Sequence, residues 1–375
     1  MKHVVTLLLV LCAWSAQGQF EVGQTDWLLI DVSRNDREIP CVVWYPAQVD
    51  GVTPAEGGFP TFVMAHGFVM SPLDYEGLAA ALVSEGYVFA SLGTEQGFAP
   101  SHADYGLDLA FVADQVASGE IVGVLSASSN GRVAIGGHSM GGGAAWLAAA
   151  EQPAIDAVVV FAPAETNPSA IAAGEEITVP VLVVSGADDA VTPPTTQHEP
   201  IYASAVNAPC RAFVSIAGGG HCGFADPGTL CDFGELGFSG LSHAEQLALS
   251  LDVVLPWLAH FVEDNPGGLA ALEEACEVEP ELELSLSCAL DVAADAEAKL
   301  EWSVFPNPNQ GSSVLRNASS AACWFIVWNS LGQSVQHEQQ VLPGCEYAMQ
   351  LDPGTYIIRV RNGKGDVQSA RLLVF

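Results

Sequence analysis

Basic residues are scarce in this chain. Its 375 residues include only 11 Lys and Arg against 44 Asp and Glu, which gives a formal net charge of −33 at pH 7. A field of this sign repels polyanions and favours solubility. We therefore expect neither nucleic acid nor an anionic membrane surface as a partner.

Long apolar runs are also missing. The longest begins the chain, where Lys2 precedes the apolar stretch 4–13 and small residues follow in Ala16-Gln17-Gly18. A membrane-spanning helix needs about 20 apolar residues, whereas a secretory signal needs a charge, a short apolar core and a small-residue cleavage site. The sequence thus predicts a signal peptide over 1–18 and no transmembrane segment.

The sequence has no paired C-x-x-C spacing, the commonest sign of a zinc site, so we expect no metal. Removal of Cys12 with the signal leaves eight of the nine cysteines, an even number that fits disulfides in an oxidising compartment. Spacing gives three candidate pairs: Cys222 with Cys231, Cys276 with Cys288, and Cys323 with Cys345. Cys41 and Cys210 would pair only if the fold brings them together.

Residues 19–265 show the alternation expected of one α/β domain, a mostly parallel sheet flanked by helices. β-Branched runs predict strands at 61–65, 87–92, 132–137, 157–162, 181–186 and 212–218, after an antiparallel edge formed by DWLLIDV and CVVWY. Ala- and Leu-rich stretches predict helices near 74–85, 103–117, 140–150, 196–206 and 243–263.

The amino-acid composition of the remaining chain changes twice. Residues 266–301 are crowded with Glu, Ala and Leu, which favours an acidic helical connector. Residues 302–375 alternate short strands with turns such as NSLGQ and LDPGTY, a pattern typical of a small all-β sandwich.

One glycine-rich stretch carries a possible nucleophile. GGHSMGGG places Ser139 between Gly137 and Gly141, directly after the strand-like RVAI and before the helix-like GGAAWLAAAEQ. A bare G-x-S-x-G occurs by chance in a glycine-rich chain, but this strand–turn–helix context is what a nucleophile elbow requires. The sequence therefore predicts Ser139 as a catalytic nucleophile.

A serine needs a base and an orienting carboxylate, in the chain order Ser, Asp, His for this type of fold. The run VLVVSGADDAVTPP supplies Asp188 and Asp189, and AFVSIAGGGHCGF supplies His221. Only one of the two carboxylates can reach His221, and we favour Asp189. Three other histidines are interpreted as structural: His138 faces away beside the nucleophile, His198 lies in a surface helix and His243 begins another helix.

Two backbone N–H groups are candidates for an oxyanion hole. Met140 follows the nucleophile, and Phe68 lies in the loop after the early strand TFVMA. The Phe68 ring would line the acyl pocket, and we interpret His66 as a residue that shapes this loop.

Together, AHGF, GHSMGGG, GADDAVTP and GGGH resemble the α/β-hydrolase superfamily over residues 26–263, specifically its dienelactone-hydrolase-like and cutinase-like branch. The resemblance implies a serine esterase without a cofactor. The acid of this branch commonly lies four residues before a proline, which matches Asp189 and Pro193. A cutinase-like polyester hydrolase or lipase is the alternative within this branch. Its polyester hydrolases carry a tryptophan where this chain has Ala164, and the missing aromatic side chain argues against polyester activity.

The C-terminal motifs FPNPNQG, VWNSLGQSV, LDPGTYIIRV and RLLVF resemble the type A sorting domain of the type IX secretion system. The resemblance implies the type IX machinery as a partner, and export through the periplasm and outer membrane to a secreted or cell-surface location. A carbohydrate-binding β-sandwich is the alternative, with Trp324 and Trp328 as its only evident aromatic platform.

The sequence thus predicts a secreted serine carboxylic ester hydrolase. Only about 17 residues separate the strand that ends near Ala162 from the next at Val181, too few for a large lid domain, so an open site would accept bulky or polymeric esters. A catalytically silent surface adhesion protein that retains the fold is the alternative of another class.

Overall fold

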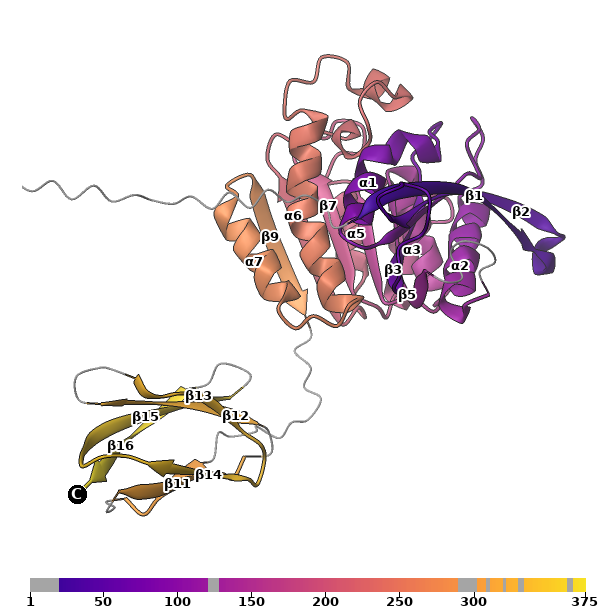
Figure 1. Cartoon of the computed structure of the whole chain (residues 1–375). Helices are drawn as coiled ribbons and strands as arrows, with labels where there is room; N and C mark the ends of the chain where they lie inside the picture. Colours follow the sequence, from indigo (N-terminus) through magenta and orange to yellow (C-terminus); the bar gives the residue numbers. More distant parts are fainter. Residues whose placement is uncertain are drawn as a thin grey trace, which may run out of the picture. The chain divides into compact units, whose positions relative to one another are not determined.

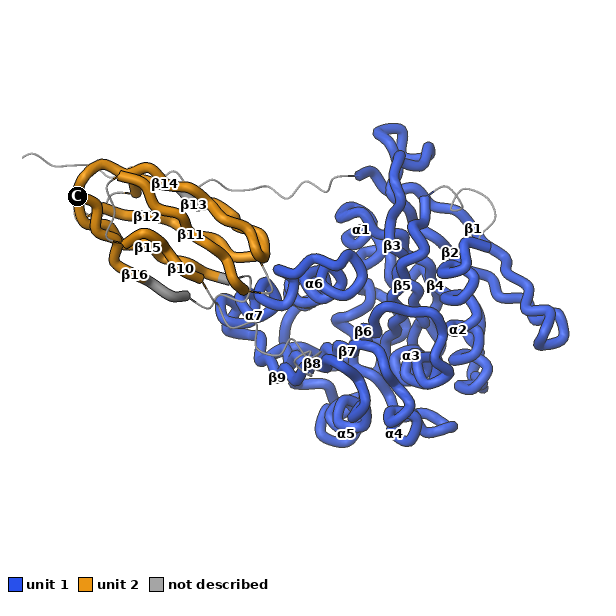
Figure 2. Tube along the Cα trace, turned by 90° about the horizontal axis from the view of Figure 1, so that it is seen from below, with its two compact units in different colours: residues 1–289 blue, residues 290–375 orange. Residues whose placement is uncertain are grey.

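The computed structural model describes residues 20–120, 128–288, 302–307, 311–319, 322–329, 334–362 and 367–375. The predicted signal peptide, residues 1–18, lies outside this part of the chain. The chain divides into two compact units, residues 1–289 and 290–375 (Figure 2). Among the described residues, no helix has the length and apolar character needed to cross a membrane.

The first unit is built on a nine-stranded sheet in the order β1-β2-β4-β3-β5-β6-β7-β8-β9 (Figure 1). The six central strands, β4, β3, β5, β6, β7 and β8, run parallel to one another. Antiparallel strands lie at both ends of the sheet, β1 and β2 at one end and β9 at the other. The strands are β1 (Glu21–Asp31), β2 (Arg37–Ala47), β3 (Phe59–Ala65), β4 (Val88–Leu92), β5 (Ser129–His138), β6 (Ala157–Phe161), β7 (Val181–Gly186), β8 (Cys210–Ile216) and β9 (Leu282–Cys288). The mostly parallel sheet predicted from the sequence is confirmed.

Helices cover both faces of this sheet, which is why its central strands are continuous apolar runs. Side chains of α1 (Glu76–Ser84), α6 (His243–Phe261) and α7 (Gly268–Val278) belong to one apolar core. Those of α2 (His102–Ser118), α3 (Met140–Ala150), α4 (Ala170–Ala173) and α5 (His198–Ser204) belong to the other (Figure 2). The four apolar residues of β7, 181–184, alternate between the two cores, and all six residues of the strand are buried.

Our expectation of a helical connector over 266–301 was wrong for residues 282–288, which form a strand. Helix α7 is present, but β9 follows it and pairs antiparallel with β8 as the last strand of the sheet. Apolar side chains of β9 pack against the core that α6 and α7 cover. The first unit therefore extends well beyond residue 265, while residues 289–301 lie outside the described part of the chain.

The same pairing corrects a disulfide. Cys288 lies directly opposite Cys210 in the β8–β9 register and is bonded to it, so the predicted pair with Cys276 does not form and Cys276 is a free thiol. Cys222 and Cys231 are bonded as expected. The buried thiol of Cys41 is free, because β2 and β8 lie near opposite ends of the sheet.

The second unit is all β. It contains a three-stranded sheet, β10-β11-β14, and a four-stranded sheet, β13-β12-β15-β16, both antiparallel. The strands are β10 (Trp302–Phe305), β11 (Ser312–Asn317), β12 (Cys323–Asn329), β13 (Ser334–Val341), β14 (Glu346–Gln350), β15 (Gly354–Asn362) and β16 (Val367–Val374). One apolar core takes side chains from both sheets. Cys323 is buried in it while Cys345 is exposed and precedes β14, so this predicted pair is also wrong and both thiols are free.

Candidate active site

Ser139 lies on the sharp turn between β5 and α3. Its backbone has φ 55° and ψ −121°, a conformation that is strained for a residue with a side chain. The turn tolerates no side chain at either predicted glycine: a Cβ on Gly137 would lie 2.2 Å from the carbonyl oxygen of Gly141, and one on Gly141 would lie 2.1 Å from that of Ala65. The two glycines thus allow the strained turn that projects Ser139 from the carboxyl end of β5.

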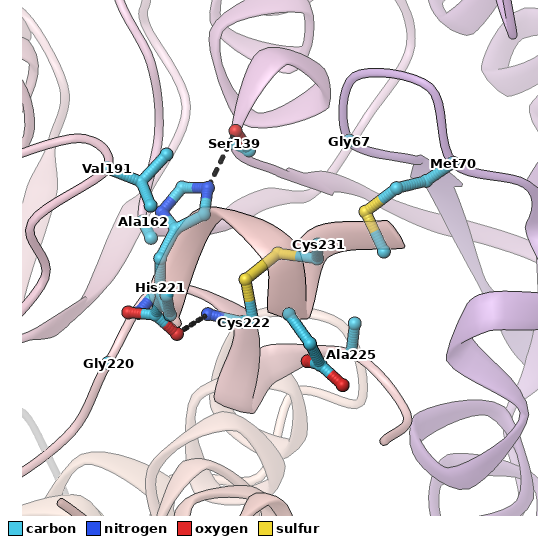
Figure 3. The surroundings of a disulfide bond; sticks show 12 residues. Gly67, Met70, Ser139, Ala162, Val191, Gly220, His221, Cys222, Ala225 and Cys231 are labelled. Carbon is cyan, nitrogen blue, oxygen red and sulfur yellow. Dashed lines mark hydrogen bonds between the residues drawn. A yellow bond between two sulfur atoms is a disulfide. The ribbon is translucent and has the colours of Figure 1, made fainter. Parts of the chain in front are cut away.

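His221 lies on the loop after β8 and faces Ser139 (Figure 3). Its Nε2 is 2.9 Å from Ser139 Oγ, and its Nδ1 is 2.7 Å from Oδ2 of Asp189. All three side chains are buried, with Ser139 8% exposed and His221 2% exposed. Three segments spread over more than 80 residues of the sequence therefore form one continuous line of hydrogen bonds.

The two candidate carboxylates, Asp188 and Asp189, differ in burial and in hydrogen-bond partners. Asp189 is buried, and its Oδ1 accepts the N–H groups of Val191 and Thr192, both at 2.8 Å. Asp188 is exposed. Burial alone raises the pKa of the Asp189 carboxyl, but the hydrogen bond and charge of His221 outweigh it and leave this pKa below its ordinary value. Asp189 is therefore held ionised beside the imidazole.

The two predicted oxyanion donors come from adjacent elements. Met140 is the first residue of α3, where an N–H group has no partner within the helix. The register of β3 and β5 pairs Ala65 with Gly137, so the loop that carries Phe68 begins beside the Ser139 turn. This loop is held by Tyr75, whose hydroxyl accepts the N–H of Gly67 at 2.9 Å.

Two side chains that the sequence did not reveal hold the His221 loop. The carboxylate of Glu235, at the end of the 3-10 helix Leu230–Glu235, accepts the N–H groups of His221 and Cys222. The fully buried amide of Gln246 on α6 pairs with Gly220, accepting its N–H at 2.8 Å and donating to its carbonyl at 2.9 Å. The disulfide between Cys222 and Cys231 (Figure 3) is a third contact that holds this loop.

The histidines interpreted as structural have different surroundings. His138 is buried, accepts from Tyr75 at Nδ1 and donates from Nε2 to the carbonyl oxygen of His221 at 3.0 Å. Burial holds the pKa of His138 well below its ordinary value, so it stays neutral. His198 does begin a helix, but the expected surface position was wrong: it is fully buried, because α5 packs over β7 and places the ring beside Ser185.

One group of side chains in the described residues has the spacing of a metal site. Ligand atoms of His138, His221 and Cys231 lie within 4.8 Å of one another. Cys231 is bonded to Cys222, and both ring nitrogens of His138 are already hydrogen-bonded. The group therefore lacks the thiolate and the free nitrogen that a zinc ion would need.

Exposed apolar side chains gather on the loops that follow the carboxyl ends of β3, β4, β7 and β8. The carboxyl ends of parallel strands share one edge of a sheet, which here is the edge that carries Ser139. We call this set the apolar rim: Phe68, Phe98, Val191, Leu230, Phe233, Leu236 and Phe238. Phe68 and Phe98 contact each other edge to face, and Val191 lies beside His221 (Figure 3).

Comparison with known proteins finds similar hydrolases. The model of a family described as PET hydrolase-like matches residues 16–238. The chain is 26% identical over 179 residues to a bis(hydroxyethyl) terephthalate hydrolase of Streptomyces coelicolor, covering 48% of this chain and 54% of that protein. It is 30% identical over 98 residues to cutinase 1 of Thermobifida cellulosilytica, covering 26% of this chain and 36% of the cutinase. It is also 31% identical over 90 residues to cutinase est1 of Thermobifida alba, covering 24% and 29%. The chain thus spans about half of the first relative's length and about a third of each cutinase's.

Proposed function

The chain belongs to the PET hydrolase-like family, and on this premise we propose that it is a serine carboxylic ester hydrolase with Ser139, His221 and Asp189 as its catalytic triad. The observation that carries the proposal is the line of hydrogen bonds from Ser139 Oγ through both ring nitrogens of His221 to the Asp189 carboxylate. In this arrangement the imidazole can take the serine proton at Nε2 while the carboxylate stabilises the imidazolium that forms.

The reaction proceeds through an acyl-enzyme. Ser139 Oγ attacks the ester carbonyl carbon as its proton passes to His221 Nε2, and the N–H groups of Phe68 and Met140 bind the oxyanion. His221 then protonates the leaving alcohol as the carbon–oxygen bond breaks. Water attacks the acyl-enzyme with His221 as general base, which releases the acid and restores Ser139.

The substrate class follows from the apolar rim and from the relatives. Exposed aromatic and aliphatic side chains at the edge of the sheet that carries Ser139 favour the bulky apolar part of an ester over a small polar one. The relatives include a bis(hydroxyethyl) terephthalate hydrolase and cutinases. We therefore propose that polymeric or aromatic esters are substrates, although Ala164 stands where related polyester hydrolases carry a tryptophan.

A panel of esters tests the proposed activity. The purified protein should hydrolyse short and long p-nitrophenyl esters, bis(hydroxyethyl) terephthalate and an amorphous polyester film, with the aromatic and polymeric members measured against the short ones. Asp189→Ala should lose far more activity than the matched control Asp188→Ala, because only Asp189 contacts His221. No turnover of any ester would instead support the silent adhesion protein, and equal losses in the two variants would remove Asp189 from the triad.

For the second unit we propose a β-sandwich that serves as a type IX sorting domain, with residues 1–18 as the signal peptide that starts export. Two antiparallel sheets around one apolar core support this proposal. Fusion of residues 302–375 to a periplasmic reporter, in a host with and without the type IX system, tests it. Secretion only where the system is present is expected, and retention in both hosts would contradict the proposal.

A further inference from the structure

A second polar cluster lies behind the Asp189 carboxylate, on the side away from Ser139. The Thr192 hydroxyl is 2.9 Å from Oδ2 of Asp189, 2.8 Å from Nδ1 of His221 and 3.0 Å from Nε2 of His198. The other ring nitrogen of His198 is 2.7 Å from the hydroxyl of Ser185. All of these side chains are buried, so each polar atom needs a partner within the protein.

The protons in this cluster have one arrangement that satisfies every group. Within the described part of the chain, His198 Nδ1 is the hydrogen-bond partner of the Ser185 hydroxyl, so Ser185 donates to that nitrogen. The proton of the neutral His198 ring is then on Nε2 and is donated to Thr192 Oγ1. The opposite tautomer would leave the buried Ser185 hydroxyl proton without an acceptor, which costs about 1 to 3 kcal/mol.

This arrangement fixes the direction of the Thr192 hydroxyl. Because its oxygen accepts from His198, its own proton is free to point at Oδ2 of Asp189, 2.9 Å away. The Nδ1–H of His221 is then left to the carboxylate, at 2.7 Å, although Thr192 Oγ1 lies almost as close. Without the His198 donor, the hydroxyl can turn to the carbonyl of Ala162, at 3.3 Å, and compete as an acceptor for the His221 proton.

We propose that His198 is a positioning residue of the ester hydrolase: through Thr192 it directs a hydroxyl proton to Asp189 and so keeps the carboxylate aligned with His221. This inference rests on the proposed function. Among the described residues the His198 ring is hydrogen-bonded to Ser185 and Thr192 and not to Ser139, and its Nε2 is 3.5 Å from Asp189 Oδ2. Burial keeps the ring neutral, so His198 acts by the direction of its N–H and adds no charge to the triad.

Paired substitutions at His198 and Thr192 test the proposal. His198→Phe and Thr192→Val remove the polar groups at similar volume, whereas His198→Gln keeps an N–H donor near the Nε2 position and Thr192→Ser keeps the hydroxyl. Thr196→Val, an exposed threonine of the same turn, is the matched control. Each variant is measured for kcat and KM on a soluble p-nitrophenyl ester, for the pH profile of kcat/KM, for the rate of phosphonate inactivation and for thermal unfolding.

We expect His198→Phe and Thr192→Val each to lower kcat and the rate of phosphonate inactivation about tenfold, with KM nearly unchanged. The reason is that a misplaced Asp189 affects the transition state more than it affects substrate binding. The acid limb of the profile should move to higher pH, since an Asp189 that has lost a donor favours protonated His221 more strongly. His198→Gln and Thr192→Ser should recover most of kcat. The double variant His198→Phe, Thr192→Val should lose no more than its worse single variant, because both act through one hydroxyl.

A His198→Phe variant with wild-type kcat and an unmoved pH profile would overturn the proposal, and so would losses that multiply in the double variant. If His198→Phe fails to fold, Thr192→Val removes the same hydroxyl without changing the His198 ring, and unchanged kcat in that variant would overturn the proposal equally. Ser139→Ala distinguishes failure of the proposed function from failure of the positioning role. An active Ser139→Ala variant refutes the proposed function. An inactive Ser139→Ala variant together with an unaffected His198→Phe variant refutes the positioning role alone.

Discussion

The carboxylate of Glu235 lies against the backbone of His221. Its Oε1 accepts the N–H of His221 at 2.5 Å, and its Oε2 accepts the N–H of the following residue, Cys222, at 2.8 Å. A carboxylate that accepts two neighbouring N–H groups fixes both the position and the direction of the peptide between them. The general base of the proposed triad is therefore held by its backbone as well as by its ring.

Replacement of this carboxylate by an amide should weaken catalysis. In Glu235→Gln one oxygen is replaced by an NH2 group that cannot accept, so one N–H of the His221 loop loses its partner, at a cost of about 1 to 3 kcal/mol. We expect kcat to fall about tenfold through misplacement of His221. Steady-state kinetics with Glu273→Gln, an exposed glutamate of α7, as the control would measure this. Equal kcat in both variants would show that Glu235 does not position the loop.

The disulfide between Cys222 and Cys231 should stabilise the same loop. Closing a loop of this length stabilises the fold by about 3 kcal/mol on chain-entropy grounds. The double variant Cys222→Ser, Cys231→Ser should therefore unfold at a lower denaturant concentration than the wild type. Its ester turnover should fall under conditions in which the domain is still folded. Peptide mapping under non-reducing conditions should find this pair together with Cys210 and Cys288. Full activity in the double variant would mean that Glu235 and Gln246 hold His221 without the disulfide.

Acid should destabilise the first unit through His198. Burial lowers the pKa of His198 to about 4 from its ordinary 6.5, so between these pH values the unfolded chain binds more protons than the folded one. The stabilisation is complete above pH 6.5 and is lost as the pH falls toward 4, by about 2 kcal/mol between pH 7 and pH 5. Urea unfolding at both pH values should show a smaller drop for His198→Gln than for the wild type. The same drop in both would contradict a buried neutral His198.

The strands and the Ser139 turn could be predicted because their signals are local. β-Branched runs that are buried on both faces identify the parallel strands, and the glycines around Ser139 are required by the turn itself. Strand β9 was missed because it is an edge strand whose residues alternate in exposure after an acidic helix, so it lacks a continuous apolar run.

Partnerships across the fold could not be predicted in the same way. The bond between Cys210 and Cys288 depends on the register of two strands that are 78 residues apart in the sequence. The burial of His198 depends on how α5 packs over the sheet, and Glu235 belongs to no motif. These contacts follow from tertiary packing, which spacing along the chain does not encode.

Truncation should show where the first unit ends. A chain that stops after residue 289 keeps β9 and the bond to Cys210 and should fold and hydrolyse soluble esters at the full rate. A chain that stops after residue 265 loses α7 and β9, which uncovers β8 and part of its core, and should be strongly destabilised. Thermal unfolding and ester turnover of the two truncated chains would measure the difference. Equal stability would show that β9 is dispensable.

The most direct test of the account is the covalent labelling of Ser139. An organophosphonate ester should inactivate the protein with the mass of one adduct, and peptide mapping should place that adduct on Ser139, because His221 activates this hydroxyl. Ser139→Ala should take up no label, and its ester turnover should fall by several orders of magnitude with unfolding unchanged. An adduct on another residue, or near wild-type turnover in Ser139→Ala, would contradict the proposed triad.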